Sequence, residues 1–139
     1  MSRSILVPAV LLAAALTGAC GSDSTPTNPT PPTAINEPPF TGTLTVNGAA
    51  TYPFPVNRTG TITATLAALS TDGAIVGFEL GTWNPTTSSC TIGTIANDQA
   101  AAGATLIGNA ASTDNFCVRI FDVGKLTAPT DFVINVTHF

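Results

Sequence analysis

Hydrophobic and polar residues alternate along most of the chain after its first forty residues, which is the pattern of half-buried β-strands. In residues 61–66, isoleucine, alanine and leucine alternate with three threonines, and the same period of two is found in 116–121 and 131–137. Further apolar runs lie near 40–46, 50–56, 74–82, 89–95 and 103–108. The pattern predicts about eight short strands, and only the alanine-rich stretch 96–104 offers room for one helical turn.

Residues that favour tight turns separate these predicted strands. Asn47-Gly48 and Asp72-Gly73 are dipeptides that readily adopt positive φ angles and close hairpins. Short strands with regularly spaced turns are typical of antiparallel sandwiches, in which two sheets cover each other's apolar face. We therefore expect an all-β antiparallel sandwich over residues 40–139, a length sufficient for a single core.

The first twenty residues have a different pattern, that of an export signal. Arg3 is followed by an apolar run over 5–16, shorter than the roughly 20 residues of a transmembrane helix, and then by small residues up to Cys20. The sequence LTGAC, which ends at Cys20, resembles the bacterial lipobox, whose cysteine is acylated and becomes the new N-terminus. This resemblance implies a lipoprotein signal peptide in 1–19 and a lipidated Cys20 that holds the protein on a lipid bilayer. The alternative is a secreted protein with an unmodified cysteine.

Gly21 follows the anchor cysteine, at the position where an aspartate is associated with inner-membrane retention in some bacteria. The expected location is therefore the cell envelope, on the outer membrane where the host has one, with the domain facing the periplasm or the exterior. Residues 20–39 are mostly serine, threonine, proline and asparagine after the cysteine, and they cannot bury enough apolar surface to become ordered. We expect a disordered linker there, either an extended spacer or a tail without a defined length.

Lipidation of Cys20 leaves Cys90 and Cys117 in an oxidising compartment, where each has one partner. They therefore predict a Cys90–Cys117 disulfide. A metal site is the competing interpretation, but the only histidine, His138, does not cluster with the cysteines, so we expect neither a metal nor a cofactor. Four aspartates are interpreted as turn formers rather than calcium ligands: Asp72, Asp98, Asp114 and Asp122.

The charged residues do not indicate nucleic-acid binding or catalysis. They make up only 9% of the chain, with a formal net charge of −4, and an acidic chain without a basic patch does not favour nucleic acid. His138 is placed on the inward-facing side of the last predicted strand, which is typical of a structural histidine. Glu79 is the only acid expected inside a strand, so no pair of catalytic carboxylates is visible. We expect a protein that is not an enzyme.

The order of the strand segments resembles the bacterial pre-peptidase C-terminal domain. Tyr52, Phe54 and Val56 match the "Y-x-F-x-V" strand of that family, and residues 116–120 match its late strand. The resemblance implies a jelly-roll-like β-sandwich that serves as an accessory or binding module and carries no catalytic residue. The family is usually appended to secreted peptidases, whereas no peptidase domain lies in residues 1–39.

Two functions remain open at this point. The first is an envelope-anchored lipoprotein that presents the sandwich for structural or protein-interaction purposes, and the second is a glycan- or peptide-binding accessory module. Trp83, at a strand end, is a candidate stacking platform, with a rim residue that caps the core as the plainer alternative. Phe121 is expected on an outer face, where it either forms an apolar patch with Val133 or is covered by a loop. Arg119 is expected to pair with an acid of a neighbouring strand.

Overall fold

The computed structural model describes residues 29–139, and of residues 92–94 it describes only the backbone. The predicted signal peptide and the lipidated Cys20 lie outside the described residues. Residues 31–139 form one compact unit that is built from strands. The strands are β1 (Ile35–Asn36), β2 (Phe40–Leu44), β3 (Ala49–Val56), β4 (Gly60–Leu69), β5 (Val76–Asn84), β6 (Ser89–Ala100), β7 (Thr105–Ala110), β8 (Asp114–Phe121) and β9 (Thr130–His138). The all-β prediction is confirmed.

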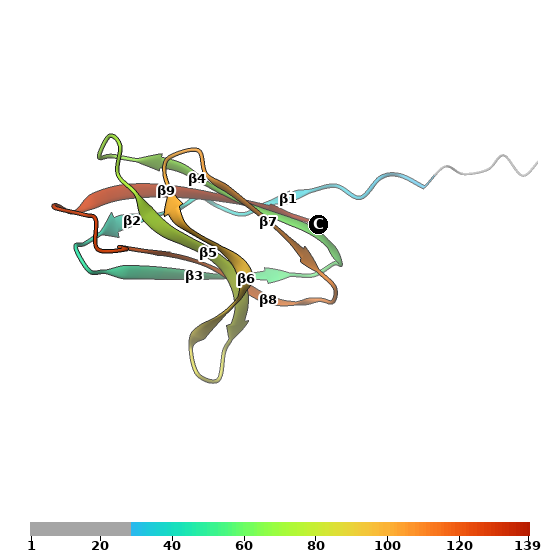
Figure 1. Cartoon of the computed structure of the whole chain (residues 1–139). Coiled ribbons are helices and arrows are strands. Elements are labelled where there is room, and N and C mark those ends of the chain that lie inside the picture. The colour runs from blue at the N-terminus through green and yellow to red at the C-terminus, as the bar shows by residue number, and fades with distance from the viewer. Residues whose placement is uncertain (1–28) are drawn as a thin grey trace, which may run out of the picture. The chain divides into compact units, whose positions relative to one another are not determined.

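The strands form two antiparallel sheets that pack face to face (Figure 1). The first sheet has the order β1–β9–β4–β7, with β2 also paired to β9, and the second has the order β3–β8–β5–β6. β1 and β2 follow one another along β9 and are separated by Pro38-Pro39, so they act as one interrupted edge strand. Counted in this way, eight strands divide between the sheets in the manner of a jelly roll, as expected.

Most consecutive strands lie in different sheets, which corrects the expectation that Asn47-Gly48 and Asp72-Gly73 close hairpins. Asn47 and Gly73 do have positive φ angles, of 55° and 70°. However, β2 and β3 belong to opposite sheets, as do β4 and β5, so both turns carry the chain from one layer to the other. Among the described strands, β5 and β6 alone pair directly as sequence neighbours.

The hydrophobic core lies between the two sheets and is made of the inward residues of the alternating strands. In β4, Ile62, Ala64 and Leu66 are fully buried, while the threonines between them face outward. Every member of the core cluster falls between Leu44 and Val136. All of the core that the structure describes thus lies within residues 31–139, and this unit is expected to fold by itself.

The ordered sheet begins earlier than the composition indicated, so the linker boundary drawn at Phe40 lies too late in the chain. Ile35 and Asn36 pair with the end of β9, and the backbone N–H of Glu37 donates to the carbonyl of Val136 at 2.9 Å. Hydrogen bonds to an existing strand supply here the stabilisation that side-chain burial in this polar segment does not.

The alanine-rich stretch 96–104 is not helical. β6 continues through Ala100, and a turn with Gly103 at a φ of 91° follows. Alanine has the highest helix propensity, but such propensities are small per residue, and the backbone hydrogen bonds that β6 makes with β5 override this one. No helix within residues 29–139 is long and apolar enough to cross a bilayer.

Candidate functional site

Both aromatic candidates lie on the outer face of the second sheet, in the part formed by β3, β8 and β5. Trp83 and Phe121 occupy opposite ends of this face, since about 20 Å of strand separates position 115, beside Trp83, from position 121. The strand register places the outward residues in rows across the three strands. These rows are Ala49–Phe121–Gly77, then Thr51–Arg119–Glu79, then Pro53–Cys117–Gly81.

Trp83 contributes to a shallow groove of about 290 Å³ at one end of this face. The indole is partly exposed, and three proline rings and one carboxamide lie around it. The other lining residues are Pro53, Phe54, Pro55, Pro85 and Asn115. A planar indole beside proline rings, with the Asn115 carboxamide as the polar group, suits a ligand that presents an apolar face together with hydrogen-bonding groups.

Pro53 and Pro55 belong to β3, which is an edge strand of its sheet. Proline has no backbone N–H and therefore cannot donate to an added strand, so it is typical of protected edges. At the two prolines, this edge of the groove therefore exposes proline rings and lacks the backbone N–H groups that an added β-strand would need. The alternating prolines in the predicted strand 50–56 are the sequence signal from which an edge strand could have been predicted.

The hairpin of β5 and β6, which carries Trp83, protrudes from the body of the sandwich (Figure 1). Cys90 of β6 and Cys117 of β8 lie at disulfide distance, with their Cα atoms 5.9 Å apart. The bond joins β6 and β8, which lie on either side of β5, and in the strand register Cys117 lies beside Gly81 and Cys90 beside Trp83. At the tip, Asn84 accepts hydrogen bonds from two backbone N–H groups of the following turn. The hairpin is therefore held by a disulfide next to its turn and by hydrogen bonds within the turn.

Phe121 differs from Trp83 because its ring is engaged within the protein. A Cβ atom at Gly77 would overlap the ring, so the ring lies directly on the backbone of β5. The guanidinium carbon of Arg119 lies 4.6 Å from the ring centroid, in cation–π geometry. The apolar patch with Val133, one of the two alternatives for Phe121, does not form, because β8 and β9 belong to different sheets and their outward side chains point away from each other.

Arg119 and Glu79 occupy the centre of the same face. The Arg119 Nη1 atom donates to Glu79 Oε2 at 3.0 Å, which confirms the expected pairing with an acid of a neighbouring strand. Glu79 is only 9% exposed, and Arg119 provides the hydrogen-bonding partner that its buried carboxylate needs. Glu79 is thus committed to an ion pair. The expectation that it is the only acid inside a strand is wrong, because Asp98 lies within β6 and Asp131 within β9.

His138 lies inside the sandwich, on the inward side of β9 as predicted, and is 1% exposed. Its Nε2 atom lies 2.9 Å from Glu37 Oε1, and its ring stacks on Phe54 with centroids 5.9 Å apart. This environment is structural, and the Glu37 partner was missed because that residue had been assigned to the linker.

Asp122 has the turn-forming role that the sequence indicated. Its Oδ2 atom accepts the N–H of Asn47 at 2.8 Å, and its Oδ1 atom accepts the N–H groups of Gly124, Lys125 and Leu126. These bonds, that from Asn47 most of all, lower the pKa of the carboxyl group below its usual value. Within residues 29–139 no three metal-ligating side chains cluster.

Fold and groove together define a jelly-roll sandwich with a ring-lined groove on one outer face. No protein-family model matches the chain, and no curated protein matches it.

Proposed function

We propose that this protein is a non-enzymatic lipoprotein of a bacterial cell envelope, anchored through acylated Cys20, whose jelly roll serves as an interaction module. The groove around Trp83 is its contact surface. The observation that carries the proposal is the partly exposed indole set among three proline rings and braced by the Cys90–Cys117 pair. Tryptophan is the residue type most enriched at the energetic centres of protein interfaces, and rigid surroundings reduce the entropy cost of binding.

A glycan-binding accessory module is the second candidate. Its support is the flat indole face together with the Asn115 carboxamide in the same groove, because a sugar ring presents an apolar face and peripheral hydroxyls. The resemblance to an accessory domain of secreted peptidases agrees with either ligand class. The acidic net charge of −4 favours neither nucleic acid nor anionic surfaces.

Acylation of Cys20 is tested by metabolic labelling with a palmitate analogue and by fractionation of the native host. Wild type is expected to carry label in the membrane fraction, and Cys20→Ser is expected to lose both the label and the membrane association. A single acyl chain binds membranes only marginally, so several chains are needed for stable anchoring. Cys90→Ser is the matched control and should keep its label. Label that persists in Cys20→Ser would refute the anchor.

The contact surface is tested with a photoreactive residue at position 85 in the groove, compared with one at position 61 on the outer face of the first sheet. Cross-links to an envelope protein are expected from position 85 only, and they should disappear in Trp83→Ala and persist in part in Trp83→Phe. A glycan array probed with wild type and Trp83→Ala distinguishes the second candidate. Equal cross-linking from both positions, with no Trp83-dependent glycan signal, would reject the groove as a binding site.

A further inference from the structure

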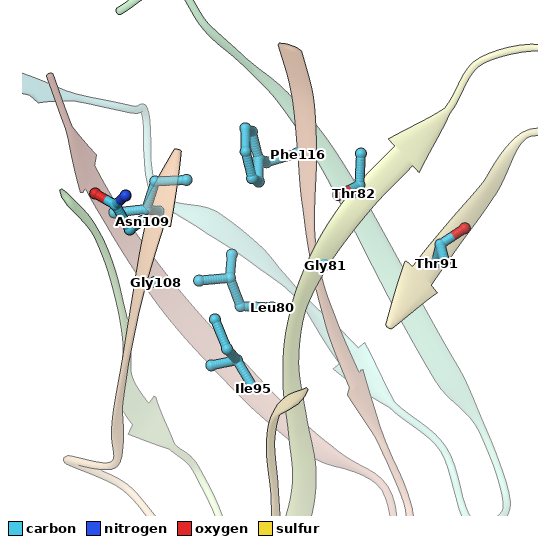
Figure 2. A pocket seen from close by; sticks show the side chains of 9 residues that line it. Leu80, Gly81, Thr82, Thr91, Ile95, Gly108, Asn109 and Phe116 are labelled. Atoms are coloured by element: carbon cyan, nitrogen blue, oxygen red, sulfur yellow. The ribbon is translucent and has the colours of Figure 1, made fainter. Parts of the chain in front are cut away.

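A second hollow, separate from the Trp83 groove, opens between the two sheets near the base of the β5–β6 hairpin. It has a volume of about 280 Å³. Figure 2 shows the side chains of Leu80, Ile95 and Phe116 directed into this space. Ile62 of β4 completes the apolar wall and is fully buried. Because the four side chains come from four different strands and both sheets, the hollow lies within the layer of the core.

The polar groups of the hollow come from Thr82, Thr91 and Asn109, all of which are solvent-exposed residues. They therefore mark the open side, whereas the apolar side chains form the interior. None of the described lining residues carries a charge. An ion inside would lack a compensating partner, so the lining excludes charged ligands.

The wall of the hollow also includes the backbone of β7 at Gly108. That strand places Leu106, Gly108 and Ala110 inward. A Cβ atom at Gly108 would lie 2.8 Å from Leu80 Cδ2 and 3.0 Å from Ile95 Cδ1. The backbone of β7 thus packs directly against the side chains that form the wall and defines its position.

We propose that this cavity binds a small, uncharged and mainly apolar molecule that carries one hydroxyl or similar polar group. The apolar body lies against Leu80, Ile95 and Phe116, and the polar group remains at the mouth with Thr82 and Thr91. An enclosed apolar cavity of about 150 Å³ binds a single benzene ring, so this larger hollow with one open side has room for a substituted ring or a branched alkyl group. The site does not depend on the function proposed for the Trp83 groove.

The test uses residues 31–139 with labelled isoleucine and leucine methyl groups, titrated with 1-naphthol and followed by NMR. Saturable shifts are expected at the methyl groups of Leu80 and Ile95, with a dissociation constant on the order of 100 μM. Ile107, which is 67% exposed on the outer face of β7, is the internal control and should not shift. Nuclear Overhauser effects between the naphthol ring and Leu80 should accompany binding.

Thr82→Phe places a ring at the mouth and is expected to weaken binding at least about tenfold. Thr61→Phe, an exposed threonine on the other sheet, is the matched control and should bind like wild type. Trp83→Ala should also leave the naphthol affinity unchanged, which separates this site from the groove. The proposal is overturned if no saturable shift occurs at Leu80 or Ile95, if the Overhauser contacts fall on Trp83, or if Thr82→Phe binds as tightly as wild type.

Discussion

Individual side chains follow the period-two alternation closely, and this includes the polar side chain of His138 in the interior. In β9, Phe132, Ile134 and Val136 are buried, and His138 continues the same side of the strand. Because the inward position forces the imidazole into the core, it needs a hydrogen-bonding partner, which Glu37 supplies. The alternation thus predicted the direction of these side chains but not the partner.

Asp122→Asn is expected to lower the free energy of unfolding at neutral pH, because the lowered pKa of Asp122 means that its charged form is stabilised in the folded state. That contribution is fully present above the ordinary carboxyl value of 3.8 and is lost as the pH falls through the lowered pKa of the folded state. Urea unfolding of wild type and variant at neutral pH and at about pH 2 measures the difference.

The exposed carboxylate of Asp98 provides the matched control, and Asp98→Asn is expected to change the urea midpoint little at either pH. The stability difference between wild type and Asp122→Asn should therefore shrink towards acid pH. A difference of the same size at both pH values would contradict the assignment of a charged hydrogen-bond acceptor at Asp122.

Strands were predicted more reliably than the connections between them. The ranges expected near 50–56 and 103–108 correspond to β3 and β7 within two residues at each end. Alternation is a local property that any half-buried strand must satisfy, so it is visible in the sequence. The turns at Asn47 and Asp72 were recognised, but a turn dipeptide does not specify whether the next strand joins the same sheet or the opposite one. At Asn47, for example, the chain changes sheets because β2 pairs with β9 whereas β3 pairs with β8.

The stability of the β5–β6 hairpin is expected to depend on the Cys90–Cys117 disulfide, because this bond joins β6 to β8 across the intervening β5. Cys90→Ala with Cys117→Ala is expected to lower the free energy of unfolding by about 3–4 kcal/mol, the loop entropy for a separation of 27 residues. Alanine is the suitable replacement because Cys117 is fully buried. Urea unfolding followed by the fluorescence of Trp83, the only tryptophan in the chain, measures the loss.

Chemical reduction of wild type is the control for this double variant and should produce the same loss of stability together with a red shift of the Trp83 emission. Reduced and oxidised wild type with equal unfolding midpoints would show that the pair does not stabilise the hairpin.

The whole sandwich closes through segments that are far apart in the sequence. β1 and β2 complete the first sheet by pairing with β9, and Glu37 reaches His138 across 101 residues of chain. The Trp83 groove likewise combines β3, β5 and β8, and the cavity at Leu80 combines both sheets. The composition of residues 20–39 resembles that of a disordered linker throughout, so it did not reveal that the last part of this range belongs to the sheet.

Removal of the residues before Phe40 is expected to destabilise the sandwich, because the removal leaves His138 without its partner and the end of β9 without β1. The fragment 40–139 should lose about 1–3 kcal/mol relative to 31–139, the usual cost of leaving a buried polar group unpaired. Chemical unfolding of the two fragments provides the comparison.

Glu37→Ala in the longer fragment separates the contribution of the side-chain contact with His138 from that of the backbone hydrogen bonds, and it is expected to reproduce only part of the loss. Equal stability of the fragments 31–139 and 40–139 would show that the sandwich begins at Phe40 after all.

The sequence by itself determined most of the strand-forming segments, the inward and outward direction of their side chains, and the all-β class, because each follows from short-range alternation. Lipidation of Cys20 stays a prediction from the sequence. The tertiary structure alone decided which strands share a sheet, which residues surround Trp83, and where the layers leave a cavity. These features arise from contacts between segments that are distant in the chain, and such contacts depend on how both sheets close around one core.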